Sequence, residues 1–491
     1  MLVIISDLHL TDGTSGASIS PGAFEIFADR LQELAVAASW RAGGRYQPID
    51  RLDLLLLGDI LDVIRSSRWL QSDVRPWSGQ EPRLCEAVTQ ITSEILRHNE
   101  PALAVLRRLA SASGLCVPAG ANGRPDPQAC VPVRVNIHYM VGNHDWFFHL
   151  PGTGYNRLRQ LVANSMGLAS PADQPFPHEP AESNSLLEVL RRHKIFARHG
   201  DVFDPFNYEG DRNQSSLGDA IVIELLSRFA QEVARELKDD LPEATLLGLR
   251  ELDNVRPTLL VPVWIDGLLE RTCPLPAIRR QVKLIWDRMA DRFLELPFVR
   301  AHDTWNPADM VDGLERLLKF SKRISIGWAA NIVRWLAGLR GQPEESYRHH
   351  ALGEQDFRNR RARYIVYGHT HYPESVPLDA SFADAAVLNQ VYFNAGTWRR
   401  VHRQTILSPA EHEFIACDMM TYLAFFQADE RKGRPYETWC GTLGISPHEA
   451  PYRRLDAGRH ANAPAATALP SRPPHFALPA SGGATVPRRR G

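Results

Sequence analysis

The chain alternates short apolar runs with longer segments in which apolar residues recur at helical spacing. The helical spacing covers residues 22–39 and 85–111. Each apolar run ends at glycine or a polar residue, and the runs cover 2–6, 52–59, 135–143, 194–201, 363–371 and 391–397. Runs of this kind are typical of strands buried on both faces of a sheet. Strands that alternate with helices predict an α/β fold.

Two regions and the end of the chain interrupt this alternation. Residues 114–132 are rich in Gly, Pro, Ala and Asn, which favours a long loop. Between 212 and 360, helical spacing dominates, over 216–239, 277–296 and 310–323. From about Ala457 the composition is typical of disorder. The predicted parts are a first core region over 1–205, a mainly helical insertion or cap over 206–360, the last core strands over 361–410, a C-terminal extension over 411–456 and a disordered tail over 457–491.

Composition narrows the class of protein. Hydrophobic residues make up 44% of the 491 residues, so the chain can bury a sizeable core. The formal net charge of -1 gives no general reason to expect nucleic acid or an anionic membrane as partner. The sequence has neither a long apolar span nor a secretory signal, so we expect a cytoplasmic protein. None of the six cysteines lies in a C-x-x-C pair, which favours free thiols over a disulfide framework.

Polar side chains follow five of the apolar runs, at the point where each predicted strand ends. In open α/β sheets, ligands bind beyond the carboxyl ends of the strands. We therefore expect these side chains to meet at one rim of the sheet. In chain order they are Asp7 and His9; Asp59 and Asp62; Asn143, His144 and Asp145; His199 and Asp201; His369 and His371.

The residue types at this rim indicate a metal site. Asp and Asn oxygens mixed with imidazole nitrogens suit Mn, Fe or Zn, whereas Ca prefers oxygen ligands and structural zinc sites are rich in Cys. Alternate residues of an extended segment point the same way, so Asp7 lies beside His9, and His369 beside His371. The set exceeds the needs of one ion and suits two, if one carboxylate bridges them. A single such residue is more often a cap or a turn residue, so the prediction depends on the joint set.

In this order and at this spacing, the motifs SDLH, GDILD, GNHD, HGD and GHTH resemble those of the calcineurin-like metallophosphoesterase superfamily. The resemblance covers residues 1–205 and 360–400. It implies a four-layer α/β/β/α sandwich that carries a helical cap. It also implies a hydrolase that cleaves a phosphoester or diphosphate bond with a metal-activated hydroxide. Two divalent ions are implied, Mn first, with Fe, Zn or Mg as alternatives.

The resemblance also assigns roles to individual residues. One metal is expected on Asp7, His9, Asp59 and His371, and the other on Asp59, Asn143, His199 and His369, with Asp59 bridging. His144 is expected to face the substrate, where it binds a phosphoryl oxygen or protonates the leaving group, held by Asp145. Asp62 and Asp201 have two interpretations, as partners that orient an imidazole or a loop, or as plain turn residues.

The substrate is less well defined by the sequence. HGDVFD and NAGTWRR are similar to the branch that contains UDP-diacylglucosamine pyrophosphohydrolases, which suggests a nucleotide-diphosphate-linked small molecule. That branch commonly has Arg where this chain has His144, and the His form is shared with nucleases and cyclic-nucleotide phosphodiesterases. These activities are the alternative, although the neutral charge makes nucleic acid the less favoured partner. An alternative of another class is a catalytically silent binding or scaffold module.

Two further features bear on partners. Residues 316–341 have basic and apolar positions with Trp but no acidic residue. Such a helix can contact a membrane surface or an acyl chain, or simply pack on the core. Four arginines that follow predicted strands are candidates for contact with a phosphate or diphosphate, with a solvated surface role as the alternative; they are Arg65, Arg68, Arg399 and Arg400. The oligomeric state is not indicated.

Overall fold

A computed structural model describes most of the chain up to residue 442. The described residues are 1–79, 82–169, 171, 173–256, 258–303, 310–321, 346–383, 386–404 and 414–442. They belong to one compact unit, Met1–Leu443. The predicted tail over 457–491 and the 322–341 part of the predicted amphipathic segment lie outside the described residues. None of the described helices is both long enough and apolar enough to cross a membrane.

The larger of two main sheets contains the first three predicted strands. Its order is β5-β2-β1-β12-β11-β7, with β13 paired to β12. The strands are β1 (Leu2–Ile5), β2 (Arg51–Leu57), β5 (Arg134–Met140), β7 (Val255–Arg256), β11 (Arg400–Gln404), β12 (Phe414–Phe425) and β13 (Tyr436–Thr442). Strands β1, β2 and β5 run parallel and are buried on both faces, which explains their continuous apolar sequence. Because β12 pairs with β1, the core sheet extends beyond the predicted boundary at residue 410.

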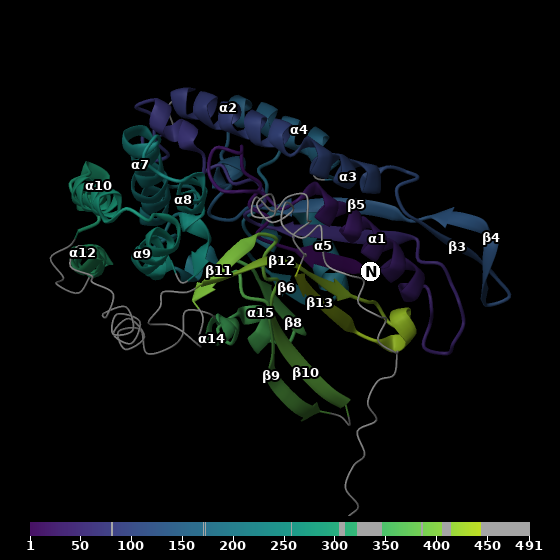
Figure 1. Ribbon diagram of the computed structural model, residues 1–491. Coiled ribbons are helices and arrows are strands. Elements are labelled where there is room, and N and C mark those ends of the chain that lie inside the picture. Colours follow the sequence, from purple (N-terminus) through teal and green to yellow (C-terminus); the bar gives the residue numbers. More distant parts are fainter. Residues whose placement is uncertain are drawn as a thin grey trace, which may run out of the picture. The chain divides into compact units, whose positions relative to one another are not determined.

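The smaller sheet has the order β6-β8-β10-β9. Its strands are β6 (Ile195–Ala197), β8 (Tyr364–Tyr367), β9 (Glu374–Ala383) and β10 (Ala386–Asn394). The first three strands in that order are parallel, and β9 forms a hairpin with β10 (Figure 1). One buried cluster joins Leu2 and Ile4 of the larger sheet to Val366 and Phe393 of the smaller sheet. Alternate residues of β1 face the opposite side, as expected for side chains along a strand.

Helices lie against the sheets through further apolar clusters. Phe24 and Phe27 of α1 share a buried cluster with Val3 of β1 and with side chains from α2, α3 and α4. Leu186 of α5 joins the cluster between the sheets, and Ala351 of α14 contacts a different cluster of the smaller sheet. These helices are α1 (Pro21–Ala38), α2 (Pro82–His98), α3 (Glu100–Ala110), α4 (Thr153–Met166), α5 (Asn184–Arg192), α14 (Arg348–Ala351) and α15 (Gln355–Arg358). The mixture of helices with parallel and antiparallel strands confirms the predicted α/β class.

A second group of helices follows β6 (Figure 1). It has its own apolar cluster, which includes Phe229, Trp264 and Trp286. The helices are α6 (Leu217–Ala220), the π-helix η5 (Ile221–Ser227), α7 (Arg228–Leu237), α8 (Glu243–Leu249), α9 (Val261–Thr272), α10 (Pro276–Leu294), α11 (Pro297–Ala301) and α12 (Met310–Ser321). The short strand β7 interrupts this group and pairs with β11 of the larger sheet. The group is therefore attached to the core by a strand as well as by its ends.

Residues 114–132 form a hairpin, which corrects the prediction of a long loop. Its strands are β3 (Cys116–Ala121) and β4 (Arg124–Pro132). The turn is Asn122-Gly123, with φ of 51° and 76°, and Asn-Gly between two strands is a strong hairpin signal. A disulfide joins Cys116 to Cys130 across the hairpin, so the prediction of free thiols is wrong for this pair. The proline and glycine content concealed the strand pattern.

A buried histidine that follows α5 provides a pH test of the fold. His193 has Nδ1 2.9 Å from the carbonyl oxygen of Val189 and Nε2 3.1 Å from the side-chain nitrogen of Gln427. Burial lowers the pKa of His193 to about 4, below its unfolded value, so the unfolded chain binds more protons between these values. We expect the free energy of unfolding to fall by up to about 3 kcal/mol from pH 6.5 to pH 4 on this account. Urea titration of His193→Gln should show a smaller fall, and an equal fall would contradict the assignment.

Candidate metal centre

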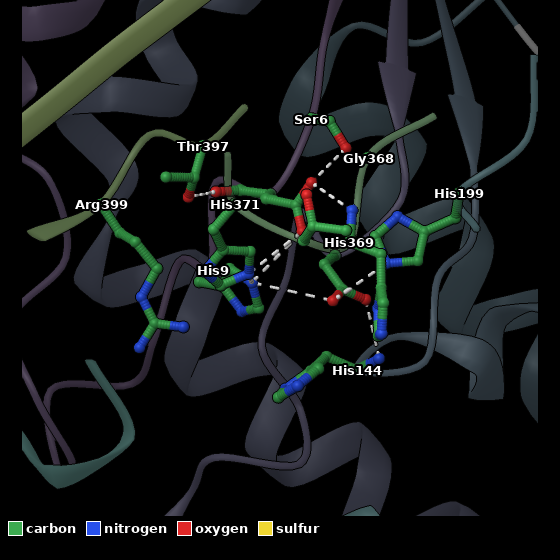
Figure 2. A network of polar contacts seen from close by, with 12 residues as sticks. Ser6, His9, His144, His199, Gly368, His369, His371, Thr397 and Arg399 are labelled. Carbon is green, nitrogen blue, oxygen red and sulfur yellow. Dashed lines mark hydrogen bonds and ion pairs between the residues drawn. The ribbon is translucent and has the colours of Figure 1, made fainter. Parts of the chain in front are cut away.

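The loops that follow β1, β2, β5, β6 and β8 bring the predicted ligands together (Figure 2). Among the described residues, three groups of His and Asp have ligand atoms within 4.8 Å of one another, and such groups could hold a metal ion. All seven predicted ligands lie in or beside these groups, namely Asp7, His9, Asp59, Asn143, His199, His369 and His371. The predicted substrate-facing residue, His144, belongs to one of the groups.

The backbone of these loops is held in an unusual conformation. Five candidate ligands have φ between 46° and 68°, a region that non-glycine residues rarely adopt; they are Asp7, His9, Asp59, His369 and His371. Hydrogen bonds between loops maintain it, such as Asp7 N to the oxygen of Gly58 at 3.1 Å. Gly142 is required by close approach, since a Cβ there would collide with Asp59 and His199. Such conformations concentrate at functional sites.

The first ligand group contains Asp7, His9 and His371, all buried. His371 Nε2 lies 3.2 Å from Asp7 Oδ1 and 3.0 Å from His9 Nε2. His9 Nδ1 lies 2.8 Å from Asp62 Oδ2, which leaves Nε2 with its lone pair facing the other two side chains. Asp7 Oδ1 is buried without a hydrogen-bond partner among the described residues. Asp7 Oδ1, His9 Nε2 and His371 Nε2 thus face one another, an arrangement that could hold a cation.

The second ligand group contains Asp59, His199 and His369, with Asn143 beside it. His199 Nδ1 donates to the carbonyl oxygen of Leu57 at 3.0 Å, and its Nε2 lies 3.2 Å from Asp59 Oδ2. His369 Nδ1 lies 3.0 Å from Asn143 Oδ1. Within the described part of the chain, His199 Nε2 has no hydrogen-bond partner. The possible metal-ligand atoms of this second group therefore also face one point.

Asp59 belongs to both sides of this arrangement. Its Oδ2 lies 3.2 Å from His199 Nε2 and 3.7 Å from His9 Nε2. Burial alone would raise the pKa of Asp59, but His199 and His144 hold it well below its usual range. Burial alone would lower the pKa of His199, but Asp59 and Asp7 raise it to about 10. The carboxylates thus attract positive charge strongly, and a divalent cation would displace protons from the imidazoles.

Asp62, not Asp145, orients His144, which corrects the prediction. His144 Nδ1 lies 2.6 Å from Asp62 Oδ1, and the other oxygen of the same carboxylate contacts His9. Burial alone would lower the pKa of His144, but Asp62 and Asp59 raise it to about 10. Of the two interpretations of Asp62, the structure therefore supports the orienting partner.

Asp145 instead ties neighbouring loops together. Its carboxylate accepts from Tyr139 Oη at 2.6 Å, Gly142 N at 2.6 Å and Ile60 N at 2.9 Å. Side chains of consecutive residues point apart, so the neighbour of His144 in sequence is not its partner in space. Asp145 is fully buried, and burial followed by the charge of Asp59 raises its pKa to about 6.

We expect Asp145→Ala to lower the free energy of unfolding by about 2–4 kcal/mol, because three buried donors would lose their acceptor. Chemical denaturation of the two proteins measures the difference. Asp240→Ala, at an exposed position, is the control and should change stability little. Equal stability of the Asp145 variant and the wild-type protein would contradict this role.

Two aspartates after β6 have distinct roles. Asp201 lies 2.7 Å from Arg212 and contacts no imidazole among the described residues, so it supports a loop. Asp204, which the sequence prediction missed, lies 3.1 Å from His369 Nε2 and leaves Nδ1 facing Asn143. Asp204 could have been identified from the sequence, because it ends the motif HGDVFD that begins with His199.

The four arginines predicted near a phosphate have different surroundings. Arg65 and Arg399 are buried, and each lies 3.1 Å from the carboxylate of Asp253. Arg68 and Arg400 form ion pairs with other carboxylates. Figure 2 shows Arg399 beside the cluster of candidate ligands.

The candidate ligands open onto a cavity of about 610 Å³. Asp59, Asn143 and His144 line its polar side. The second group of helices supplies an apolar side, which includes Val222, Leu225, Leu226, Val261, Trp286 and Leu314. Part of that side is the π-helix η5, a conformation often found at functional sites. A cavity with a few convergent polar groups and apolar walls suits a small molecule.

Comparison of the chain with models of known protein families gives no match, and no curated protein matches it. The interpretation of the site therefore depends on its own geometry and chemistry.

Proposed function

We propose that this protein is a metal-dependent hydrolase that cleaves a phosphoester or diphosphate bond in a small molecule, using two divalent ions, most readily Mn. The observation that carries the proposal is the shared position of Asp59 between two groups of His and Asp ligands, with His144 beside them. We further propose that it belongs to the calcineurin-like metallophosphoesterase superfamily, which the motif order suggests.

The arrangement of layers supports the proposed four-layer α/β/β/α sandwich. The two main sheets share a buried apolar cluster, which includes Ile4 and Val366. A separate cluster joins the opposite face of the larger sheet to α1, and another joins the smaller sheet to α14. Helix, sheet, sheet and helix thus follow one another through three apolar contacts.

Asp7, His9, Asp59 and His371 would hold one ion, and Asp59, Asn143, His199 and His369 the other. When bound, a pair of divalent ions lowers the pKa of water and neutralises charge on a phosphoryl group. Asp62, Asp204 and the carbonyl oxygen of Leu57 fix the imidazole rings so that the remaining nitrogens face the centre.

His144 is the proposed proton donor to the leaving group. Its Nδ1 is bound to Asp62, so Nε2 is the nitrogen that can contact a substrate oxygen. The charge of Asp62 favours the protonated imidazole, which is the form that donates. His144 also lines the cavity, so a substrate there can reach it.

Hydrolysis of bis(p-nitrophenyl) phosphate tests the proposal. We expect chelator-treated protein to lose at least roughly 100-fold in rate and Mn to restore it. A panel of nucleotide diphosphate sugars, cyclic nucleotides, phosphomonoesters and DNA then identifies the substrate class. Absence of metal-dependent hydrolysis of every member of the panel would contradict the proposed function and favour a silent binding module.

A further inference from the structure

A pair of arginines stands beside the candidate metal centre on adjacent strands. Arg256 of β7 is in register with Arg403 of β11, and both side chains line the cavity. Arg256 Nη2 lies 3.2 Å from His371 Nδ1, which places its guanidinium next to a candidate ligand. Both arginines are half-buried, so they face the cavity while remaining partly shielded from bulk water.

The polar contacts of this pair are made to backbone oxygens, an imidazole and an aromatic ring. Arg256 donates from Nη1 to the backbone oxygens of Asp253 and Val255, at 2.6 and 3.0 Å. Arg403 lies over the ring of Tyr372, 4.7 Å from its centre. Among the described residues, no carboxylate forms an ion pair with either guanidinium.

Two further arginines, Arg65 and Arg399, lie close enough to Arg256 for their positive charges to repel one another. Arg65 and Arg399 are both 2% exposed and share the single carboxylate of Asp253. Arg65 Nη2 and Arg399 Nε and Nη1 are buried without a hydrogen-bond partner in the described part of the chain. The guanidinium groups of Arg65, Arg256 and Arg399 thus all lie near the carboxylate of Asp253. Buried charge is unfavourable unless it is compensated, so a bound anion would add to the stabilisation that Asp253 provides.

We propose that Arg256 and Arg403 form an anion subsite that binds a second negatively charged group of the substrate, separate from the phosphate that is cleaved. This inference rests on the proposed function. It specifies the substrate class as a phosphoester or phosphoanhydride with another phosphate or a carboxylate close to the scissile phosphorus. Guanidinium groups bind phosphate and carboxylate alike through paired hydrogen bonds. Experiment must therefore distinguish which of the two is the second anionic group of the substrate.

Binding to the full-length Mn-loaded protein tests the subsite, with titration calorimetry as the measurement. The probes are methyl phosphate, methyl diphosphate and 2-phosphoglycolate. In the wild-type protein we expect at least one of the two probes with a second anionic group to bind roughly 10–100-fold more tightly than methyl phosphate. Whichever binds more tightly identifies the second group as phosphate or carboxylate.

The variants Arg403→Gln and Arg256→Gln should each reduce that preference by about 10-fold or more, and in Arg403→Gln, which does not contact a candidate ligand among the described residues, methyl phosphate binding should change by less than about threefold. Arg403→Lys should retain part of it. Arg400→Gln is the matched control, because Arg400 lies on the same strand but pairs with Asp418 outside the cavity lining, and should keep the full preference. Thermal unfolding checks that each variant is folded. Substitution of Arg403 should disturb the fold less than substitution of Arg256, because Arg403 donates to no backbone carbonyl among the described residues.

The outcomes separate this inference from the proposed function. Protein that binds Mn and hydrolyses phosphodiesters, yet binds all three probes equally, overturns the subsite alone. A preference that survives in both glutamine variants does the same. Protein that neither retains Mn nor hydrolyses any ester overturns the proposed function.

Discussion

Asp59→Asn is expected to reduce kcat/KM for a phosphodiester by roughly 1,000-fold or more, because Asp59 belongs to the second ligand group and also lies 3.7 Å from His9 of the first. The substitution keeps the size of the side chain, and its Oδ1 can still accept from the backbone nitrogen of His144, now at 2.8 Å. It removes the negative charge and the Oδ2 atom that lies between His199 and His9. The loss should therefore come from the metal centre and leave the loops in place.

The measurement is the steady-state rate in saturating Mn, together with the metal content of the variant. Asp53→Asn is the matched control, since Asp53 is a buried aspartate on β2, the strand that precedes Asp59, and contacts His138 and Arg51 away from the site. This control should lose stability but keep its rate and its metal. An Asp59 variant with full activity would exclude the bridging role.

Asp62→Asn should lower kcat by roughly 100-fold, because one carboxylate orients both His9 and His144. The pH dependence should change as well. Burial alone would lower the pKa of His144, and the charge of Asp62 is the main opposing effect that raises it. A proton donor loses activity as the pH rises through its pKa. Without Asp62, that loss should begin at a lower pH than in the wild-type protein.

Rates of hydrolysis across the pH range measure this shift. Asp201→Asn is the control, because Asp201 is a buried carboxylate that contacts Arg212 and, among the described residues, no imidazole. The pH at which this variant begins to lose activity should match the wild-type value. A shift caused by Asp145→Asn but not by Asp62→Asn would instead favour the partner that the sequence order suggested.

The core strands and the candidate ligands could be predicted because each is indicated by a short, local pattern in the sequence. Strands β1, β2 and β8 are buried on both faces and therefore have continuous apolar sequence. Asp7, Asp59 and His371 follow directly after such strands. The position of each was thus indicated by its own neighbours in the sequence.

The features that were missed depend on contacts distant in sequence. The pairing of β1 with β12 joins residues at opposite ends of the described chain, and β7 contains only Val255 and Arg256. The choice of Asp62 over Asp145 as the partner of His144 is set by the approach of the β2 and β5 loops. The arginine pair likewise exists only because β7 lies beside β11.

Metal stoichiometry is the most direct test of whether Asp59 helps to hold two ions. Purified wild-type protein and Asp59→Asn would be dialysed to equilibrium against Mn and their metal content measured by elemental analysis. We expect about two Mn ions per wild-type chain and clearly fewer in the variant. Absence of bound Mn in the wild-type protein, or equal content in the two proteins, would contradict this expectation.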